Sequence, residues 1–418
     1  MSDTTVRIKT WIFQNLDLAC SIMRRVRPNF VVDGQAFITR FDGVNEVLSR
    51  DDVFHVTYAQ KMEKVTSGGN FFLGMQDTPT YTRDVSHMRL TARRTDIDER
   101  ILPFVNASCA QILSTLDGEC DVVKALTRVV PTRFIGDYFG TPGWNQEEFT
   151  DAASLMFAYL FYPSNEASEN TALAAARTTC DYLDQTIQER KSHRDEHDDV
   201  LERCLVLQDS GHPGMSDRDI RNNLIGLLIG AIPTTSKCVA LTLDYLFEHP
   251  DLLAEAQQAA RADNDKLMLQ YVRECLRLNA FAAGVQRICS RDYIVNEGSW
   301  YAARIPKDTV VLVATQSAMM DSRKVAKPNE FRLDRPDYLY MHYGVGMHTC
   351  FGAHINDAQV PAILKSVLKL EGLRRVAPMQ SAGPFPVSLK IAFDSRNTPP
   401  SNPHKTVHKP IHEKEEVA

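Results

Sequence analysis

The sequence predicts a mainly α fold with small β-sheets, and three stretches of the 418-residue chain carry this prediction. From about Arg83 to Tyr245, apolar residues recur mostly at the three- and four-residue spacing of a helix face. Residues 28–42 instead alternate between apolar and polar side chains, as the strands of a short hairpin do. Residues 292–313 form a second stretch with strand character. Helices should therefore dominate the fold.

The N-terminal hairpin and the longest helix follow from local signals. Asp33 and Gly34 stand at the middle of the alternating stretch, and such a pair favours a two-residue hairpin turn. A break rich in glycine, proline and serine covers residues 209–217. A long apolar helix is predicted to follow it, from Asp219 to about His249.

The C-terminal third mixes one helix, the second strand region and a polar tail. Residues 266–278 have helical spacing, and the segment from Ile305 to Asp308 is predicted to be the turn of the later strands. After Ser395 the chain is rich in proline, histidine and lysine and has no apolar periodicity. Residues 395–418 are therefore predicted to be a disordered tail.

Composition excludes several classes of function. The chain is 44% hydrophobic and 24% charged, which suits a large globular core, and its length alone would suit two or three domains. A net charge of −6 argues against a broad basic surface for nucleic acid. No apolar run approaches membrane-spanning length, and Met1–Thr10 lacks a signal pattern, so we expect a cytoplasmic protein without a transmembrane anchor. The nine cysteines form no C-x-x-C pairs, which argues against a zinc cluster or a disulfide framework.

Residues 342–352, His-Tyr-Gly-Val-Gly-Met-His-Thr-Cys-Phe-Gly, carry most of the functional information. They surround Cys350 with glycines and precede an apolar helical pattern. Glycine allows positive backbone angles and a close approach of the chain to a bound group. A cysteine near a helix N-terminus is favoured as a thiolate. Taken alone, a single cysteine in a glycine turn is usually an ordinary buried residue.

This segment resembles the haem-thiolate loop of the cytochrome P450 superfamily, an aromatic residue followed by G-x-G-x-H-x-C-x-G. The matching positions are Tyr343, Gly344, Gly346, His348, Cys350 and Gly352. The resemblance runs from about residue 31 to residue 389 and implies a single cytochrome P450 domain over residues 1–394. It also implies haem b as the cofactor, with Cys350 as the axial ligand of its iron. A thiolate ligand donates electron density to haem iron and favours O–O cleavage.

A second signature lies in the predicted helix 266–278. Glu274 and Arg277 are three positions apart and share a helix face, which alone is a common surface pattern. Their position relative to Cys350 resembles the E-x-x-R pair of the family, which packs against an arginine preceding the haem loop. Arg335, in Phe331-Arg-Leu-Asp-Arg-Pro336, matches that arginine. By this resemblance the three residues are structural and not catalytic.

The family also pairs haem propionates with buried cations, because two carboxylates need compensating charge. Arg287 resembles one propionate partner and His348 a second, although His348 could instead make only a local hydrogen bond. The third expected site is altered, since Tyr81 and Val85 replace the histidine and arginine common in the family. Four arginines could compensate: Arg83, Arg89, Arg93 and Arg94.

The long predicted helix contains Gly230-Ala-Ile-Pro-Thr-Thr235, which resembles the oxygen-side pattern [AG]-G-x-[DE]-T-T. Small residues, including Ala231, would leave room for haem and O₂, and Thr234 and Thr235 match the threonines. Pro233 replaces the usual acid, and a proline inside a helix is expected to kink it. Either Pro233 only shapes the helix, or the reaction needs fewer external protons.

A second departure is Asp357, which stands where the family often has an arginine, near the face where redox partners dock. The leading interpretation is a monooxygenase that oxidises a hydrophobic small molecule, with electrons from a ferredoxin and its reductase. The alternatives are a peroxygenase or a hydroperoxide-rearranging enzyme, and a non-enzymatic haem-binding sensor. The resemblance places substrate specificity in loops, here residues 53–75 and 157–172, and near Phe281, Ala282 and Ala283.

Overall fold

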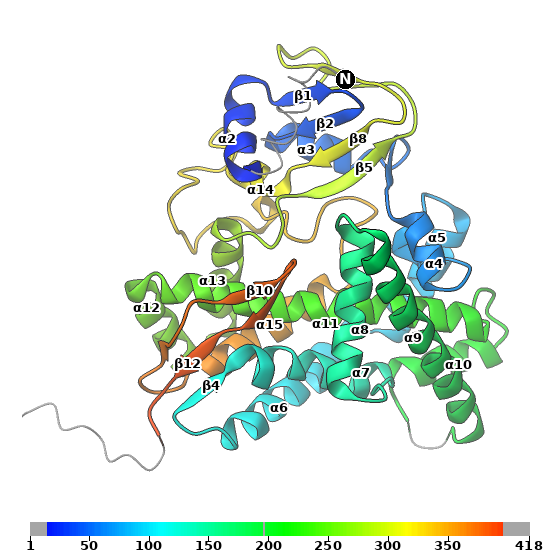
Figure 1. Ribbon diagram of the computed structural model, residues 1–418, viewed down its shortest axis with the longest axis vertical. Helices are drawn as coiled ribbons and strands as arrows, with labels where there is room; N and C mark the ends of the chain where they lie inside the picture. The colour runs from blue at the N-terminus through cyan, green and yellow to red at the C-terminus, as the bar shows by residue number, and fades with distance from the viewer. Residues whose placement is uncertain (1–14, 195–196, 396–418) are drawn as a thin grey trace, which may run out of the picture.

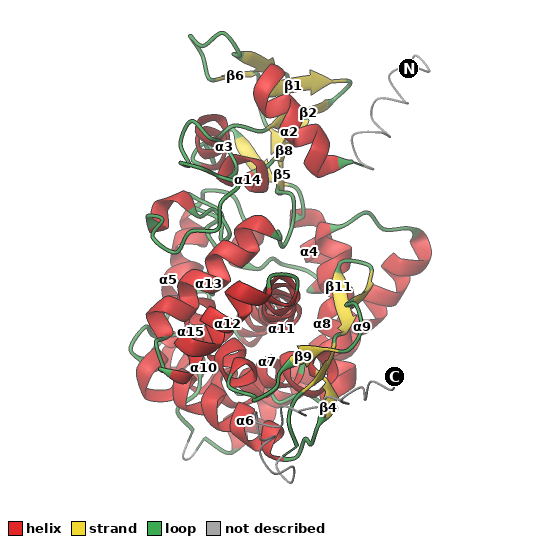
Figure 2. Cartoon of the chain, turned by 90° about the vertical axis from the view of Figure 1, so that its left-hand side faces the viewer, coloured by secondary structure: helices red, strands yellow, loops and turns green. Residues whose placement is uncertain are grey.

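The computed structural model describes residues 15–194 and 197–395. The predictions that concern Met1–Thr10 and the tail from residue 396 onward lie outside the described residues. Within them helices dominate, and small sheets lie at one end and along one side (Figures 1 and 2). The prediction of a mainly α fold with small β-sheets is confirmed.

Fourteen α-helices and four short helical turns are assigned among the described residues. The α-helices are α2 Leu16–Val26, α3 Phe41–Leu48, α4 Ala59–Val65, α5 Pro79–Thr91, α6 Leu102–Ser114, α7 Val129–Phe139, α8 Gln146–Phe161, α9 Glu166–Ser192, α10 Val200–Asp209, α11 Asp217–Phe247, α12 Pro250–Arg261, α13 Asp265–Leu278, α14 Thr315–Met319 and α15 Ala353–Leu368. The short turns are η1 Phe72–Gly74, η2 Ile97–Ile101, η3 Val123–Thr127 and η4 Asp337–Leu339.

The strands form four small sheets. Their bounds are β1 Asn29–Val32, β2 Gln35–Ile38, β3 Phe54–Val56, β4 Glu119–Asp121, β5 Val285–Cys289, β6 Tyr293–Val295, β7 Ala303–Ile305, β8 Val310–Val313, β9 Arg374–Arg375, β10 Gln380–Ala382, β11 Phe385–Ser388 and β12 Lys390–Ala392. The largest sheet has the order β1-β2-β8-β5-β3, and only its β2–β8 pair is parallel. The others pair β4-β12-β9, β10-β11 and β6-β7.

The predicted N-terminal hairpin and the predicted later turn are both confirmed, although the later turn does not join two paired strands. β1 and β2 pair antiparallel around Asp33 and Gly34, whose φ angles of 45° and 72° are those of a primed turn. The segment from Ile305 to Asp308 instead joins strands of two different sheets, since β7 pairs with β6 and β8 with β2 and β5. Periodicity could not show which strands pair, because pairing depends on distant segments.

Helix α11 runs through the middle of the helical part, with the other helices around it (Figure 2). Ser216 and Asp219 form a capping box that fixes its start, two residues before the predicted start. Its 31 residues span about 47 Å at the usual rise per residue. Pro233 lies inside the helix, which runs without a break from Asp217 to Phe247.

Two sequence predictions about segments need correction. Among the described residues α11 is long and apolar enough to cross a membrane, contrary to the prediction that no run approaches that length. Most of this run (78%) is buried, so it packs in the protein core. The predicted specificity loops are partly helical, because residues 53–75 contain α4 and η1, and residues 157–172 contain the end of α8 and the start of α9.

Candidate haem-thiolate site

The Cys350 loop connects η4 to α15, which begins three residues after the cysteine. Gly344 and Gly346 have φ angles of 73° and 80°, which side chains other than glycine rarely adopt. The Cys350 N–H donates a 2.9 Å hydrogen bond to the Tyr343 carbonyl, which closes the loop. The sequence-predicted glycines therefore fold the segment into a tight turn ahead of a helix N-terminus.

Burial raises the pKa of the Cys350 thiol to about 11, while a hydrogen bond from the Gly352 backbone opposes the shift. Desolvation thus outweighs the helix terminus, which alone would favour the thiolate. A coordinated metal cation reverses this balance, because a coordinating thiol loses its proton. Without such a cation, the Cys350 thiol is therefore not a freely reactive thiolate.

Glycine positions on both sides of this site open onto free space. A Cβ atom added at Gly230 or Gly352 would meet nothing within 4 Å, and one at Gly344 would meet only the His348 carbonyl at 3.9 Å. Gly230 is exposed although α11 around it is mostly buried, and Ala231 is only partly buried. The surface of α11 and the Cys350 loop therefore both present backbone without side-chain cover.

Two buried side chains, that of Arg287 and that of His348 in the Cys350 loop, have nitrogen atoms without partners, although Arg287 Nη1 donates to the Gln286 carbonyl. The Nε atom of Arg287 and both ring nitrogens of His348 make no hydrogen bond with the residues that the structure describes. The nearest ion-pair contact of His348, to Asp51, is 3.9 Å long. Burial, with Arg287 and His55, lowers the pKa of His348 to about 4, and burial lowers the pKa of Arg287. Buried donors without acceptors are rare and indicate a missing partner.

Tyr81, which replaces the family histidine, lies against the haem loop. Its hydroxyl donates a 2.6 Å hydrogen bond to the Met347 carbonyl, and its ring centroid is 6.0 Å from that of His348. The hydroxyl thereby fixes the loop and does not replace the missing charge.

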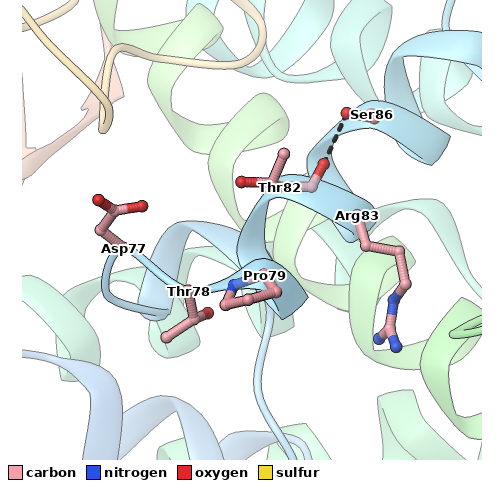
Figure 3. Close-up of a pocket in the computed structure, with 6 residues that line it drawn as sticks. All are labelled: Asp77, Thr78, Pro79, Thr82, Arg83 and Ser86. Carbon is pink, nitrogen blue, oxygen red and sulfur yellow. Dashed lines mark hydrogen bonds between the residues drawn. The ribbon is translucent and has the colours of Figure 1, made fainter.

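The four arginines proposed as substitutes have different surroundings, and burial together with nearby Arg94 and Arg89 lowers the pKa of His354. Arg83 pairs with Asp84 at 2.7 Å, and Arg89, Arg93 and Arg94 are exposed. Arg83 also borders a surface pocket at the start of α5, where its guanidinium points away from Asp77 and Ser86 donates to the Thr82 carbonyl (Figure 3). No residue of the Cys350 loop lines this pocket, so it is separate from the haem site.

The predicted structural trio lies together in the core. Arg277 Nε and Arg335 Nε lie 2.7 and 3.1 Å from the same oxygen of Glu274, and all three side chains are almost fully buried. Tyr340 and the Arg332 backbone also donate to this carboxylate, while both arginines donate to backbone carbonyls of residues 326–330. A buried carboxylate with several donors is well compensated. The network therefore ties α13 to the segment before the Cys350 loop.

The adjacent residues Thr234 and Thr235 of α11 point in different directions. Thr234 is partly exposed, and its hydroxyl donates to the Gly230 carbonyl. Thr235 is fully buried; its hydroxyl donates to Asn356 on α15 and accepts from Gln359, both at 3.0 Å. The Thr235 hydroxyl thus joins α11 to α15, and Thr234 is the better placed of the two for the predicted oxygen-side role.

Asp357 also differs from its prediction. Its carboxylate accepts hydrogen bonds of 2.9 Å from Arg273 and from the Tyr343 hydroxyl. The side chain is 27% exposed, and Arg273 balances its charge. Asp357 therefore does not present a free reversed charge to a redox partner.

Comparison with known proteins identifies the class that this fold and site define. The family model described as Cytochrome P450 matches residues 33–370, so the chain belongs to the cytochrome P450 family. The predicted resemblance is confirmed, and membership implies a haem-thiolate cofactor and makes the protein an oxidoreductase of this family.

Relatives and solved structures agree with the family at low identity. Cytochrome P450 CYP107DY1 of Priestia megaterium is 23% identical over 82% of this chain and 78% of its own length. Nocardicin C N-oxygenase of Nocardia uniformis subsp. tsuyamanensis is 23% identical over 78% of this chain and 84% of its own. A bifunctional dioxygenase–epoxy alcohol synthase of Pyricularia oryzae is 20% identical over 85% of this chain, which spans 36% of that protein.

The structure of P450BioI in complex with an acyl carrier protein ligated to hexadec-9Z-enoic acid superposes with a TM-score of 0.79. It covers 92% of this chain and all of the neighbour at 17% identity, which shows the same fold.

The described residues fit a haem group. A flat macrocycle needs uncovered backbone, which Gly230, Gly344 and Gly352 provide. Its two carboxylates need donors, and Arg287 and His348 have buried donors to spare.

Sequence reasoning missed Lys237 and Phe385. Lys237 is buried on α11, and its Nζ lies 4.4 Å from the centroid of Phe281 and 6.0 Å from that of Phe385. A lysine within an otherwise apolar helical run was a usable signal, because lysine is rarely buried. No local signal indicates Phe385, whose contacts come from distant segments.

Proposed function

We propose that the protein is a haem-thiolate monooxygenase that oxidises a hydrophobic small molecule with O₂ and two electrons from an external ferredoxin and its reductase. The proposal rests on one observation above others. The Cys350 loop has uncovered glycine backbone, and the buried side chains of Arg287 and His348 have nitrogen atoms without partners among the described residues. An ordinary buried cysteine would require neither feature.

Haem b, when bound, supplies reductive activation of O₂, and its thiolate ligand favours O–O cleavage. In this proposal Cys350 Sγ ligates the iron, and Arg287 and His348 donate to the two propionates. Ala231, Gly344 and Gly352 leave room for the macrocycle, while Tyr343 orients the loop through its bond to Asp357.

Thr234 is the residue proposed to hold a proton on the oxygen side. Its hydroxyl donates to the Gly230 carbonyl, four residues back on the partly uncovered face of α11. The acid that normally precedes this threonine is absent, because Pro233 is buried in its place. Ordered water must therefore renew the proton on Thr234.

Aromatic residues support a hydrophobic substrate. Phe157 of α8 lies 6.4 Å from Phe281 and 5.4 Å from Phe385, measured between ring centroids. The three rings come from distant parts of the chain and form an apolar wall beside α11. The burial of α11 within the fold favours a cytoplasmic location, which is part of the proposal.

A second candidate function is a peroxide-using or hydroperoxide-rearranging enzyme. Pro233 favours it, because such a reaction does not require proton delivery to reduced O₂. The fungal relative named as an epoxy alcohol synthase gives it weak support. Asp357 does not support this second candidate, since its charge is paired with Arg273. A third candidate, a haem-binding sensor, would bind no substrate; a substrate-induced spin shift would argue against it.

The proposal is tested by turnover of the purified haem-loaded protein with fatty acids, lipid hydroperoxides and terpenoids. Each compound is supplied either with NAD(P)H and surrogate ferredoxin partners or with hydrogen peroxide alone. Product only in the reductase arm would support the monooxygenase. Product only with peroxide, or from hydroperoxides without any donor, would support the second candidate.

A further inference from the structure

Lys237 stands alone as a charged residue in the apolar middle of α11. In the sequence of this helix the neighbouring charged residues are Arg221 and Asp244. Lys237 is only 8% exposed. Among the described residues no carboxylate lies within 4.0 Å of its ammonium group, and the group donates no hydrogen bond.

The surroundings of this lysine are aromatic. Its Nζ lies 4.4 Å from the ring centroid of Phe281 and 6.0 Å from that of Phe385. Cation–π contacts offset part of the desolvation cost, typically by about 0.5–2 kcal/mol, but they supply no counter-ion. Cys238 is the one titratable group that acts on Lys237, and burial raises its pKa to about 12, so it stays neutral.

Position along the helix connects Lys237 to the candidate site. Gly230, Thr234 and Lys237 follow one another at spacings of four and three, which places them on one face of α11. This is the face on which Gly230 is exposed and Thr234 partly exposed. Lys237 is about 4.5 Å along the helix axis from Thr234, given the rise per residue.

A buried cation without a counter-ion is unfavourable unless something else compensates it. A lysine kept only for packing is more easily replaced by an apolar residue. Paired lysines elsewhere in the fold show the contrast. Lys365 is also 8% exposed, but it forms ion pairs with Asp263 and Asp265.

We propose that Lys237 anchors the carboxylate of an otherwise apolar substrate, whose hydrocarbon part packs against Phe157, Phe281 and Phe385. One lysine supplies one positive charge, which matches a monoanionic carboxylate. The ammonium offers three donors to its oxygens. This inference rests on the proposed function, because it assigns a substrate class to the pocket of the same site.

Binding measurements on the haem-loaded protein test the anchor without electron donors or peroxide. Dodecanoic acid and dehydroabietic acid are each compared with their methyl esters by calorimetry and by the Soret shift at pH 7. The variants are K237M, which keeps length but not charge, and K237R, which keeps the charge. K365M is the matched control, since it removes an equally buried lysine that is already paired.

The wild type should bind at least one acid about tenfold or more tighter than its ester, as a charge-assisted hydrogen bond allows. K237M should lose this preference while ester affinity changes less than about threefold. K237R and K365M should keep a preference for the acid. Equal affinity for acid and ester, an unchanged preference in K237M, or no binding of either acid would overturn the anchor.

The anchor and the monooxygenase can fail separately. Acid binding that depends on Lys237, together with product only from peroxide, would leave the anchor intact and reject the monooxygenase. Turnover of neutral compounds only, with NAD(P)H and the ferredoxin partners, would support the monooxygenase and reject the anchor. A proton-delivery role for Lys237 would instead lower turnover of ester and acid alike in K237M, without changing acid binding, and would also overturn the anchor.

Discussion

The hydroxyl of Tyr343 donates a hydrogen bond of 2.9 Å to the carboxylate of Asp357, fourteen residues further along the chain and on the other side of Cys350. Arg273 of α13 donates to the other oxygen of the same carboxylate, also at 2.9 Å. Through these two bonds, Asp357 of α15 joins Tyr343, at the start of the haem loop, to Arg273 of α13. Asp357 is therefore better explained as a partner of Tyr343 and Arg273 than as a surface charge.

Tyr343→Phe should lower the free energy of unfolding by about 1.5–3 kcal/mol, because it removes a partly buried hydrogen bond to a charged acceptor. Chemical denaturation of the haem-loaded protein, followed by circular dichroism, measures the change. Tyr338→Phe is the control, since Tyr338 is 75% exposed and its loss should change stability by less than about 0.5 kcal/mol. Equal stability of the two variants would contradict the role given to the pair.

Arg287→Ala should weaken haem retention, because it removes a buried Nε donor that has no acceptor in the described part of the chain. Loss of one charge-assisted hydrogen bond corresponds to roughly a tenfold or greater rise in the rate of haem transfer to an acceptor protein. Arg304→Ala is the control, since Arg304 is exposed and pairs with Asp292. If both variants lose haem at the wild-type rate, Arg287 does not bind a propionate.

Thr234→Ala and Thr235→Ala should separate catalysis from stability. Thr234→Ala should lower product formed per NAD(P)H by about tenfold or more, as loss of a proton-transfer group does, and should leave stability nearly unchanged. Thr235→Ala should cost about 1–3 kcal/mol of stability, because Gln359 and Asn356 lose their shared hydroxyl. The amount of product that Thr235→Ala forms per NAD(P)H should stay near the wild-type value. The reverse pattern would show that Thr235 is the oxygen-side residue.

Binding of a carboxylate at Lys237 should depend on pH. Burial lowers the pKa of Lys237 to about 8, so the free protein loses this charge as the pH rises through that value. Since the carboxylate prefers the protonated amine, the apparent Kd of dodecanoate should be flat below about pH 8. Above it, the Kd should rise by about tenfold per pH unit.

K237R should show no such rise, because arginine stays protonated throughout this range. The methyl ester serves as the ligand control and should give a flat profile in both proteins. A wild-type profile for the acid that is equally flat from pH 6.5 to 10 would exclude the ammonium as the anchor.

Local motifs explain why much of the fold and the haem loop could be predicted. The glycines around Cys350 impose their own backbone angles. Ser216 and Asp219 form the capping box that starts α11, and they are close together in the sequence. Glu274 and Arg277 share a helix turn, so their contact follows from spacing once the helix is known. Such features need no knowledge of distant contacts.

The remaining features depend on contacts between distant segments. Thr234 and Thr235 are adjacent, and the sequence could not show which one faces the oxygen side, since that depends on how α15 packs against α11. The partner of Asp357 lies on α13, and the aromatic neighbours of Lys237 come from β11 and from the segment after α13. Spacing within one element does not indicate these contacts.

The most direct test of the account is the origin of the oxygen atom in the product. Wild-type protein is supplied with NAD(P)H, surrogate ferredoxin partners and a substrate that gives product, under ¹⁸O₂ in ordinary water. The account predicts that one ¹⁸O atom enters each molecule of product, as a monooxygenase requires. Product without ¹⁸O would contradict it.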